Sequence, residues 1–279
     1  MLANIMGESE NKAPRPANQT SVFVKRKQTF TFAFLTVLAL FAFSSWVTEY
    51  NVITGVSSIP TAFMWIGRNL IPNERAVSRL PIILQFLTET ALVAVAVTVC
   101  SAICSFFFAL LGTRTTKAHP VIARSVRVIA SFFRNVPDVV WAILLLFSFG
   151  QNILTGFFAL FFYTFGTLTR AFIETIDEAS ASCVEALRAT GASRLHIVFQ
   201  GIIPSTLSVI VSWVLYMIET NIRASTLIGI LTATGIGFLF DIYYKRMDYA
   251  SAGLVVISIV ILVIAIEFTS NQIRKVILK

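Results

Sequence analysis

The sequence has few charged residues: 13% of its 279 residues are charged, whereas 56% are hydrophobic, and the mean hydropathy is +0.80. Soluble domains carry about a quarter charged residues, so this chain lacks the polar surface that a water-soluble fold needs. This composition predicts an all-α protein that crosses a lipid bilayer several times.

Residue types that carry chemistry are equally scarce, with three cysteines and two histidines. Cys100, Cys104 and Cys183 lack the spacing of a metal site, and His119 and His196 do not complete a Ser/His/Asp set. No Walker A sequence is present, so the chain cannot hydrolyse ATP by itself. We therefore expect no catalytic residue, metal or cofactor in this chain.

The formal net charge is +8, which raises the question of nucleic acid binding. However, no basic stripe is interleaved with aromatic residues on a polar face. Basic residues at the ends of apolar segments are instead typical of cytoplasmic loops in membrane proteins. We expect a lipid bilayer, and no nucleic acid, as the partner of these charges.

Six apolar runs approach the roughly 20 residues that a helix needs to span a bilayer. They are residues 30–48, 86–111, 121–149, 153–173, 202–222 and 250–268. Pro137 is expected to kink the third, and a short interfacial helix is expected around 63–70. The predicted organisation is a polar tail (1–29), a first span (30–48), an extracytoplasmic segment (49–85), a five-helix core (86–274) and a short tail (275–279).

The basic residues also predict the orientation. Most Lys and Arg residues outside the apolar runs lie on the side that holds the N-terminus, for example Lys25, Arg114 and Arg188. Under the positive-inside rule both termini are then cytoplasmic. The first run lacks a small-residue cleavage pattern, so we expect it to be retained as a signal anchor.

This topology places a polar interruption, residues 178–201, in the cytoplasm between the fourth and fifth spans. It reads as two short helices separated by Gly191, with Ser193 as the N-cap of the second. Spacing alone leaves two interpretations open. The segment is either an amphipathic hairpin on the bilayer surface or a rigid knob that docks on another protein.

"EALRATGAS" (185–193), followed at the right distance by "GIIP", resembles the EAA signature of permease subunits of binding-protein-dependent ABC importers. The resemblance implies a type I importer permease fold, MetI-like, with six transmembrane helices in a bacterial inner membrane. Its coupling helix would dock on a cytoplasmic ATPase. Leu187 and Gly201 depart from the family pattern. The coupling residues carried over are Glu185, Ala186, Leu187, Gly191 and Leu195.

The same resemblance implies three protein partners: a second copy of the chain, an ATPase dimer that binds ATP and Mg²⁺, and an extracytoplasmic substrate-binding protein. In this interpretation the coupling segment transmits closure of the ATPase dimer to the two spans attached to it.

Charged residues inside the apolar runs are functional candidates because they are costly in lipid. Three Arg–carboxylate pairs stand at i,i+4 spacing, and each pair either serves transport or merely neutralises itself. The pairs are Arg134 with Asp138, Arg170 with Glu174, and Arg223 with Glu219.

"RNVPDVVWA" (134–142), "ETNIRASTLIGI" (219–230) and "TGIGF" (234–238) resemble the phosphonate/phosphite class of these permeases. Tyr163 departs from that class. The resemblance implies a phosphorus oxyanion as cargo, with an anion path and a glycine-rich outer turn. The alternatives are another small solute, or an intramembrane enzyme acting on a lipid phosphate. The path residues expected are Arg134, Asp138, Glu219, Asn221 and Arg223, and the turn residues are Gly229, Gly235 and Gly237.

Overall fold

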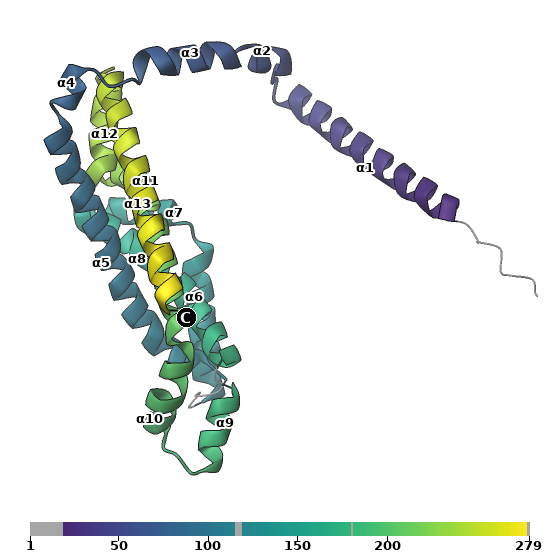
Figure 1. The fold of residues 1–279 in the computed structure, drawn as a ribbon, viewed down its shortest axis with the longest axis vertical. Helices are drawn as coiled ribbons and strands as arrows, with labels where there is room; N and C mark the ends of the chain where they lie inside the picture. The colour runs from purple at the N-terminus through teal and green to yellow at the C-terminus, as the bar shows by residue number, and fades with distance from the viewer. Residues whose placement is uncertain (1–18, 115–118, 180, 278–279) are drawn as a thin grey trace, which may run out of the picture. The chain divides into compact units, whose positions relative to one another are not determined.

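The computed structural model describes residues 19–114, 119–179 and 181–277, and every regular element in these ranges is a helix (Figure 1). This confirms the predicted all-α fold class. In chain order the elements are α1 (Gln19–Val47), α2 (Val52–Ser57), α3 (Ile59–Asn69), α4 (Glu74–Val77), α5 (Leu80–Gly112), α6 (Pro120–Asn135), α7 (Asp138–Phe149), α8 (Ile153–Ala179), α9 (Ala181–Ala189), α10 (Arg194–His196), the π-helix η1 (Ile197–Ile202), α11 (Ile203–Thr232), α12 (Gly235–Lys245) and α13 (Tyr249–Ile277).

The chain divides into two units, Met1–Met64 and Trp65–Lys279. In the first unit, α1 is apolar, and none of its most hydrophobic stretch is buried against protein. Such a helix is expected to be surrounded by lipid. α1 begins at Gln19, inside the predicted polar tail of 1–29, and residues 1–18 lie outside the described residues.

Five helices among the described residues are long and apolar enough to cross a membrane: α1, α5, α8, the continuous run from α10 to α11, and α13. Counting the bent pair α6 and α7 as one span gives six. The chain is therefore a multi-pass membrane protein, and each predicted apolar run overlaps one of these helices.

The predicted third span, 121–149, is two helices rather than one. α6 and α7 meet at 89°, so the expected kink at Pro137 is a complete break. Val136 is extended (φ −93°, ψ 118°), because a residue before proline is disfavoured in the helical region. Asp138 then starts α7, with its carboxylate accepting a hydrogen bond from the Val139 amide at 2.9 Å.

α8 is the central helix of the second unit. It packs against α5, α6, α7 and α11. In its most hydrophobic stretch 61% of the residues are buried, compared with 28% in that of α5. Large buried side chains such as Leu168, Phe172 and Ile176 form the core here. Because α8 leads directly into α9, the best-packed helix is also the one attached to the polar interruption.

The bundle of the second unit has two ends (Figure 1). The α9 end comprises the ends of α5 and α8, the start of α6 and the segment from α9 to η1. The far end comprises α4, the start of α5, and α12 with its turn into α13.

Candidate functional site

The helix–glycine–helix segment predicted between the fourth and fifth spans is present. Gly191 has a left-handed φ of +78° after α9, and its amide donates to the Arg188 carbonyl at 3.0 Å. Ser193 caps α10, since its hydroxyl accepts a hydrogen bond from the His196 amide at 3.4 Å. α10 is a single turn that continues into η1, a π-helix that the sequence pattern does not predict. Short π-helical segments frequently mark functional sites.

This α9–α10 segment has a packed side and an exposed side. Val184 is buried and Leu187 packs against the same cluster, which also contains Ile197. Leu195 is 70% exposed, and Phe199 in η1 is exposed next to it. The predicted coupling residues on the exposed side are Glu185, Ala186, Gly191 and Leu195. An apolar, exposed tip on a packed support is the geometry of a docking knob, and Leu187 belongs to the support.

The two departures from the family signature contact each other. A Cβ added at Gly201 would lie 2.9 Å from Leu187 Cδ1, so the leucine occupies the room that a larger residue at 201 would need. Since Gly201 is buried, this close packing fastens α9 to η1. The departures therefore compensate each other and leave the segment intact.

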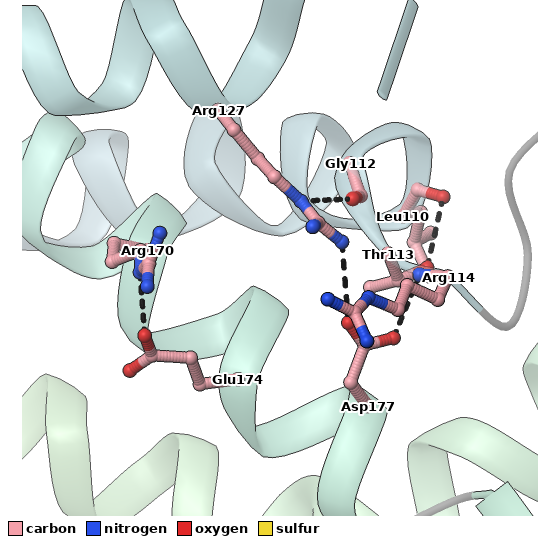
Figure 2. A network of polar contacts seen from close by, with 8 residues as sticks. All are labelled: Leu110, Gly112, Thr113, Arg114, Arg127, Arg170, Glu174 and Asp177. Carbon is pink, nitrogen blue, oxygen red and sulfur yellow. Dashed lines mark hydrogen bonds and ion pairs between the residues drawn. The ribbon is translucent and has the colours of Figure 1, made fainter. Parts of the chain in front are cut away.

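A polar network at the end of α8, the helix that precedes α9, joins three elements (Figure 2). Arg127 of α6 donates through Nε to the Gly112 carbonyl at 3.0 Å and through a terminal nitrogen to Asp177 Oδ2 at 3.3 Å. The other oxygen of Asp177 accepts a hydrogen bond from the Arg114 amide at 2.7 Å. The last turn of α8 is thus tied to the end of α5 and to α6.

No local sequence pattern predicts this network, because Arg127 and Asp177 are 50 positions apart and neither is in an i,i+4 pair. The neighbouring pair was predictable: Arg170 Nε donates to Glu174 Oε1 at 2.5 Å within α8, as the spacing predicts. A cavity of about 490 Å³ is lined by both groups of residues. Three arginines and three acidic residues line the cavity, so its lining has no net positive charge to attract an anion.

The predicted pairing of Arg134 with Asp138 is wrong, because the helix breaks between them. Arg134 is exposed at the end of α6 and makes no ion pair within the described ranges, while Asp138 is the first residue of α7 and accepts a hydrogen bond from the Val139 amide. The prediction assumed a continuous helix, in which residues four apart share a face.

The predicted pairing of Glu219 with Arg223 is confirmed. Arg223 donates to Glu219 Oε1 at 3.1 Å, with the arginine side chain 51% exposed and the glutamate side chain 14% exposed. The positive member therefore faces outward from α11 and the negative member lies against the bundle.

Asn221 of α11 lies inside the bundle, between α5 and α8. It is fully buried, and its amide donates to Thr98 Oγ1 of α5 at 2.8 Å and to Thr164 Oγ1 of α8 at 3.0 Å. The path role of Asn221 stays a prediction; in this conformation the residue packs between helices. Interhelical hydrogen bonds of this kind hold α5, α8 and α11 together inside the membrane.

The glycine-rich turn lies toward the far end, where the Ile236 amide at the start of α12 donates to Thr90 Oγ1 of α5 at 2.8 Å. Gly235 has a φ of +60° and starts α12. A Cβ at Gly229 would lie 2.5 Å from the Thr234 carbonyl oxygen, and one at Gly237 would collide with the Thr226 carbonyl. These contacts are with backbone, so α12 can fold back on α11 only because both positions lack a side chain.

Arg79 closes the same end by joining α5 to the turn between α12 and α13. It pairs with Asp248, donates to Ser251 Oγ at 3.0 Å, and lies 4.9 Å from the centre of the Tyr243 ring. Burial acts to raise the pKa of Asp248, but hydrogen bonds from Ser251 and Arg79 outweigh it and hold that pKa below its usual value.

Residues 105–278 match the model of the family described as "Binding-protein-dependent transport system inner membrane component". The chain belongs to this family. Membership confirms the resemblance read from the EAA-like segment, which lies inside the matched region. Membership also makes the chain an inner membrane component of a transport system, in line with the expectation of a permease.

Two relatives of this chain are named as permeases for phosphorus oxyanions. The chain is 30% identical over 190 residues to "Phosphate-import permease protein PhnE" of Mycolicibacterium smegmatis, covering 68% of this chain and 36% of that protein. It is 28% identical to "Phosphite transport system permease protein PtxC" of Stutzerimonas stutzeri, covering 68% and 69% of the two chains. The chain thus spans about a third of the length of the first relative.

The fold also matches a solved transporter. An inward-facing structure of the MetNI methionine ABC transporter aligns with a TM-score of 0.58 at 21% identity, covering 70% of this chain and 97% of that one. At this identity the match concerns the fold alone. It confirms the predicted MetI-like permease fold.

Proposed function

We propose that this permease passes a phosphorus oxyanion, such as phosphonate, phosphite or phosphate, through an importer powered by a separate ATPase. The observation that carries the proposal is the exposed α9–α10 segment with its EAA-like sequence, in a family of binding-protein-dependent importers. The cargo class is supported by the names of the relatives and by the two arginines discussed next.

Arg134 and Arg223 are the proposed cargo contacts. Both guanidinium groups are exposed. Arg134 has no carboxylate partner within the described ranges, and Arg223 forms an ion pair with Glu219. A planar guanidinium matches the oxygens of a phosphorus oxyanion in two parallel hydrogen bonds. Two copies of the chain would supply two of each arginine along one path, enough to admit an anion, while the nearby acids Asp138 and Glu219 limit its retention.

The proposed assembly has two copies of this chain, an ATPase dimer that binds ATP and Mg²⁺, and an extracytoplasmic binding protein. The chain lies in the bacterial inner membrane with both termini in the cytoplasm. The α9 end then faces the ATPase, and the glycine turn at the far end faces the binding protein. Closure of the ATPase dimer moves α9, and α8 and α11 move with it because they are covalently attached.

Co-purification tests the proposal. The chain is isolated from its native membrane with its neighbours, and ATPase activity is measured with binding protein loaded with phosphite, methylphosphonate or phosphate. We expect an associated ATPase, stimulated by at least one loaded form, and loss of stimulation in Glu185→Arg. Absence of any associated ATPase would contradict the transporter assembly, and stimulation by unrelated solutes only would contradict the cargo.

A further inference from the structure

α6 is fastened to α8 at two points, and the first is a backbone contact in the middle of the bundle. A Cβ at Gly166 of α8 would lie 2.5 Å from the Arg134 amide nitrogen and 2.8 Å from the Ala130 carbonyl oxygen. The last turn of α6 therefore rests directly on α8. A contact this close leaves little freedom for the two helices to slide.

The second point is the ion pair between Arg127 and Asp177 (Figure 2). Both side chains are partly buried, and each also bonds the end of α5, through the Gly112 carbonyl and the Arg114 amide. Partial burial reduces screening by water and salt, so the pair is worth more than a surface ion pair. Two points of attachment along its length make α6 follow α8.

α6 connects this network to the proposed cargo site. Arg127 and Arg134 are seven positions apart, so they lie on the same face of α6, about 10 Å apart along its axis. Asp177 lies in the last turn of α8, directly before α9. The order along the structure is therefore α9, Asp177, Arg127, α6 and Arg134.

We propose that Arg127 and Asp177 are positioning residues that transmit the movement of α9 to α6, and so set the position of Arg134 during the transport cycle. The inference rests on the proposed function, since it needs an ATPase that moves α9. The inference adds a direct mechanical link between the end of α8 and α6. The covalent chain does not supply this link, because α7 and α8 separate α6 from α9 in the sequence.

The neighbouring pair Arg170–Glu174 is a matched control. It borders the same cavity and has the same charges, but both members belong to α8, so it joins no second element. Neutralising Glu174 changes the local charge by the same amount as neutralising Asp177. Only the Asp177 change removes a link between helices.

The test is a distance measured by spin labels in the chain bound to its ATPase. Labels are placed at Phe132→Cys on α6 and Ile264→Cys on α13, both exposed positions, after the native cysteines are replaced by Ala. The distance is recorded without nucleotide and after trapping with ATP and vanadate. Further variants carry Asp177→Asn, Arg127→Gln, Arg127→Lys or Glu174→Gln.

We expect trapping to change the distance in the unsubstituted and Glu174→Gln chains, and the change to fall by more than half in Asp177→Asn and Arg127→Gln. Arg127→Lys keeps the charge and should retain most of the change. A full change in Asp177→Asn and Arg127→Gln would overturn this inference alone, as would equal losses in Arg127→Lys and Arg127→Gln. An ATPase that fails to bind the unsubstituted chain would overturn the proposed function, and this inference with it.

Discussion

The two ends of the bundle are packed in different ways. At the far end, Gly229 and Gly237 face backbone carbonyls, which cannot move aside without unfolding a helix turn. At the α9 end, Gly112 and Gly201 face the tips of Ile173 and Leu187, which can change rotamer. At these four glycines, the far end packs against main chain and the α9 end against side chains.

The ion pairs follow the same division. Arg79 at the far end has three fixed partners, namely the Asp248 carboxylate, the Ser251 hydroxyl and the Tyr243 ring. Arg127 at the α9 end reaches Asp177 at 3.3 Å beside an open cavity, where other acids lie within a helix turn. At the end proposed to meet the ATPase, side chains such as Arg127 and Asp177 therefore form the links between helices.

The largest effect is expected from Gly237→Ala at the far end. The added Cβ collides with the Thr226 carbonyl, so α12 must move away from α11. We expect a loss of about 3 kcal/mol, the upper part of the usual range for overpacking. Thermal unfolding of the purified chain in detergent measures it. A variant as stable as the unsubstituted chain would remove the basis for calling this end rigid.

Asn221→Leu, midway between the ends, is expected to cost about 1–2 kcal/mol, because Thr98 and Thr164 lose a buried partner. If the residue packs helices and does not touch cargo, the ATPase activity stimulated by binding protein should remain unchanged per folded molecule. Unfolding and ATPase assays on the same preparation separate the two roles. Normal stability with lost stimulation would support the predicted path role.

Gly201→Ala is the matched substitution at the α9 end and should cost less than about 1 kcal/mol, since Leu187 Cδ1 can rotate away. Leu187→Ala on the same background should recover part of that loss by making room. A double-mutant cycle on unfolding free energies gives the coupling between the two positions. Strictly additive losses would mean that the two departures from the family signature do not compensate.

Acid should affect the far end through Asp248. Its pKa lies below the ordinary 3.8 in the folded chain, so its contribution to stability is present above about pH 4 and is lost as pH falls through the lowered value. We expect the smallest effect here, within about 1 kcal/mol. Unfolding at pH 5 and pH 3 should differ less in Asp248→Asn than in the unsubstituted chain. An identical pH response in both chains would contradict this.

Local patterns in the sequence predicted much of the fold and part of the site. The apolar runs located the spans, and Gly191 with Ser193 located the turn of the α9–α10 segment, because each feature depends on adjacent residues. The i,i+4 rule found Glu219–Arg223 and Arg170–Glu174. It failed for Arg134 and Asp138, since it takes helix continuity for granted across Pro137.

Other features depend on residues that meet only in the folded chain. Arg127 and Asp177 come from different helices, and the burial of Asn221 depends on threonines of α5 and α8. Pro137 interrupts the helix, but the 89° angle depends on how α6 and α7 each pack against α8, and η1 packs against α9. Spacing within one helix carries no information about such contacts.

The most direct test of the account is a cross-link between the α9–α10 segment and the ATPase. Leu195→Cys, in a chain whose native cysteines are replaced by Ala, is treated with a short thiol cross-linker in native membranes that contain an ATPase with single surface cysteines. Tyr244→Cys at the far end, also exposed, is the control. The account predicts a cross-link from position 195 that ATP and vanadate alter, and none from position 244. No product at 195, or a product at 244 only, would contradict it.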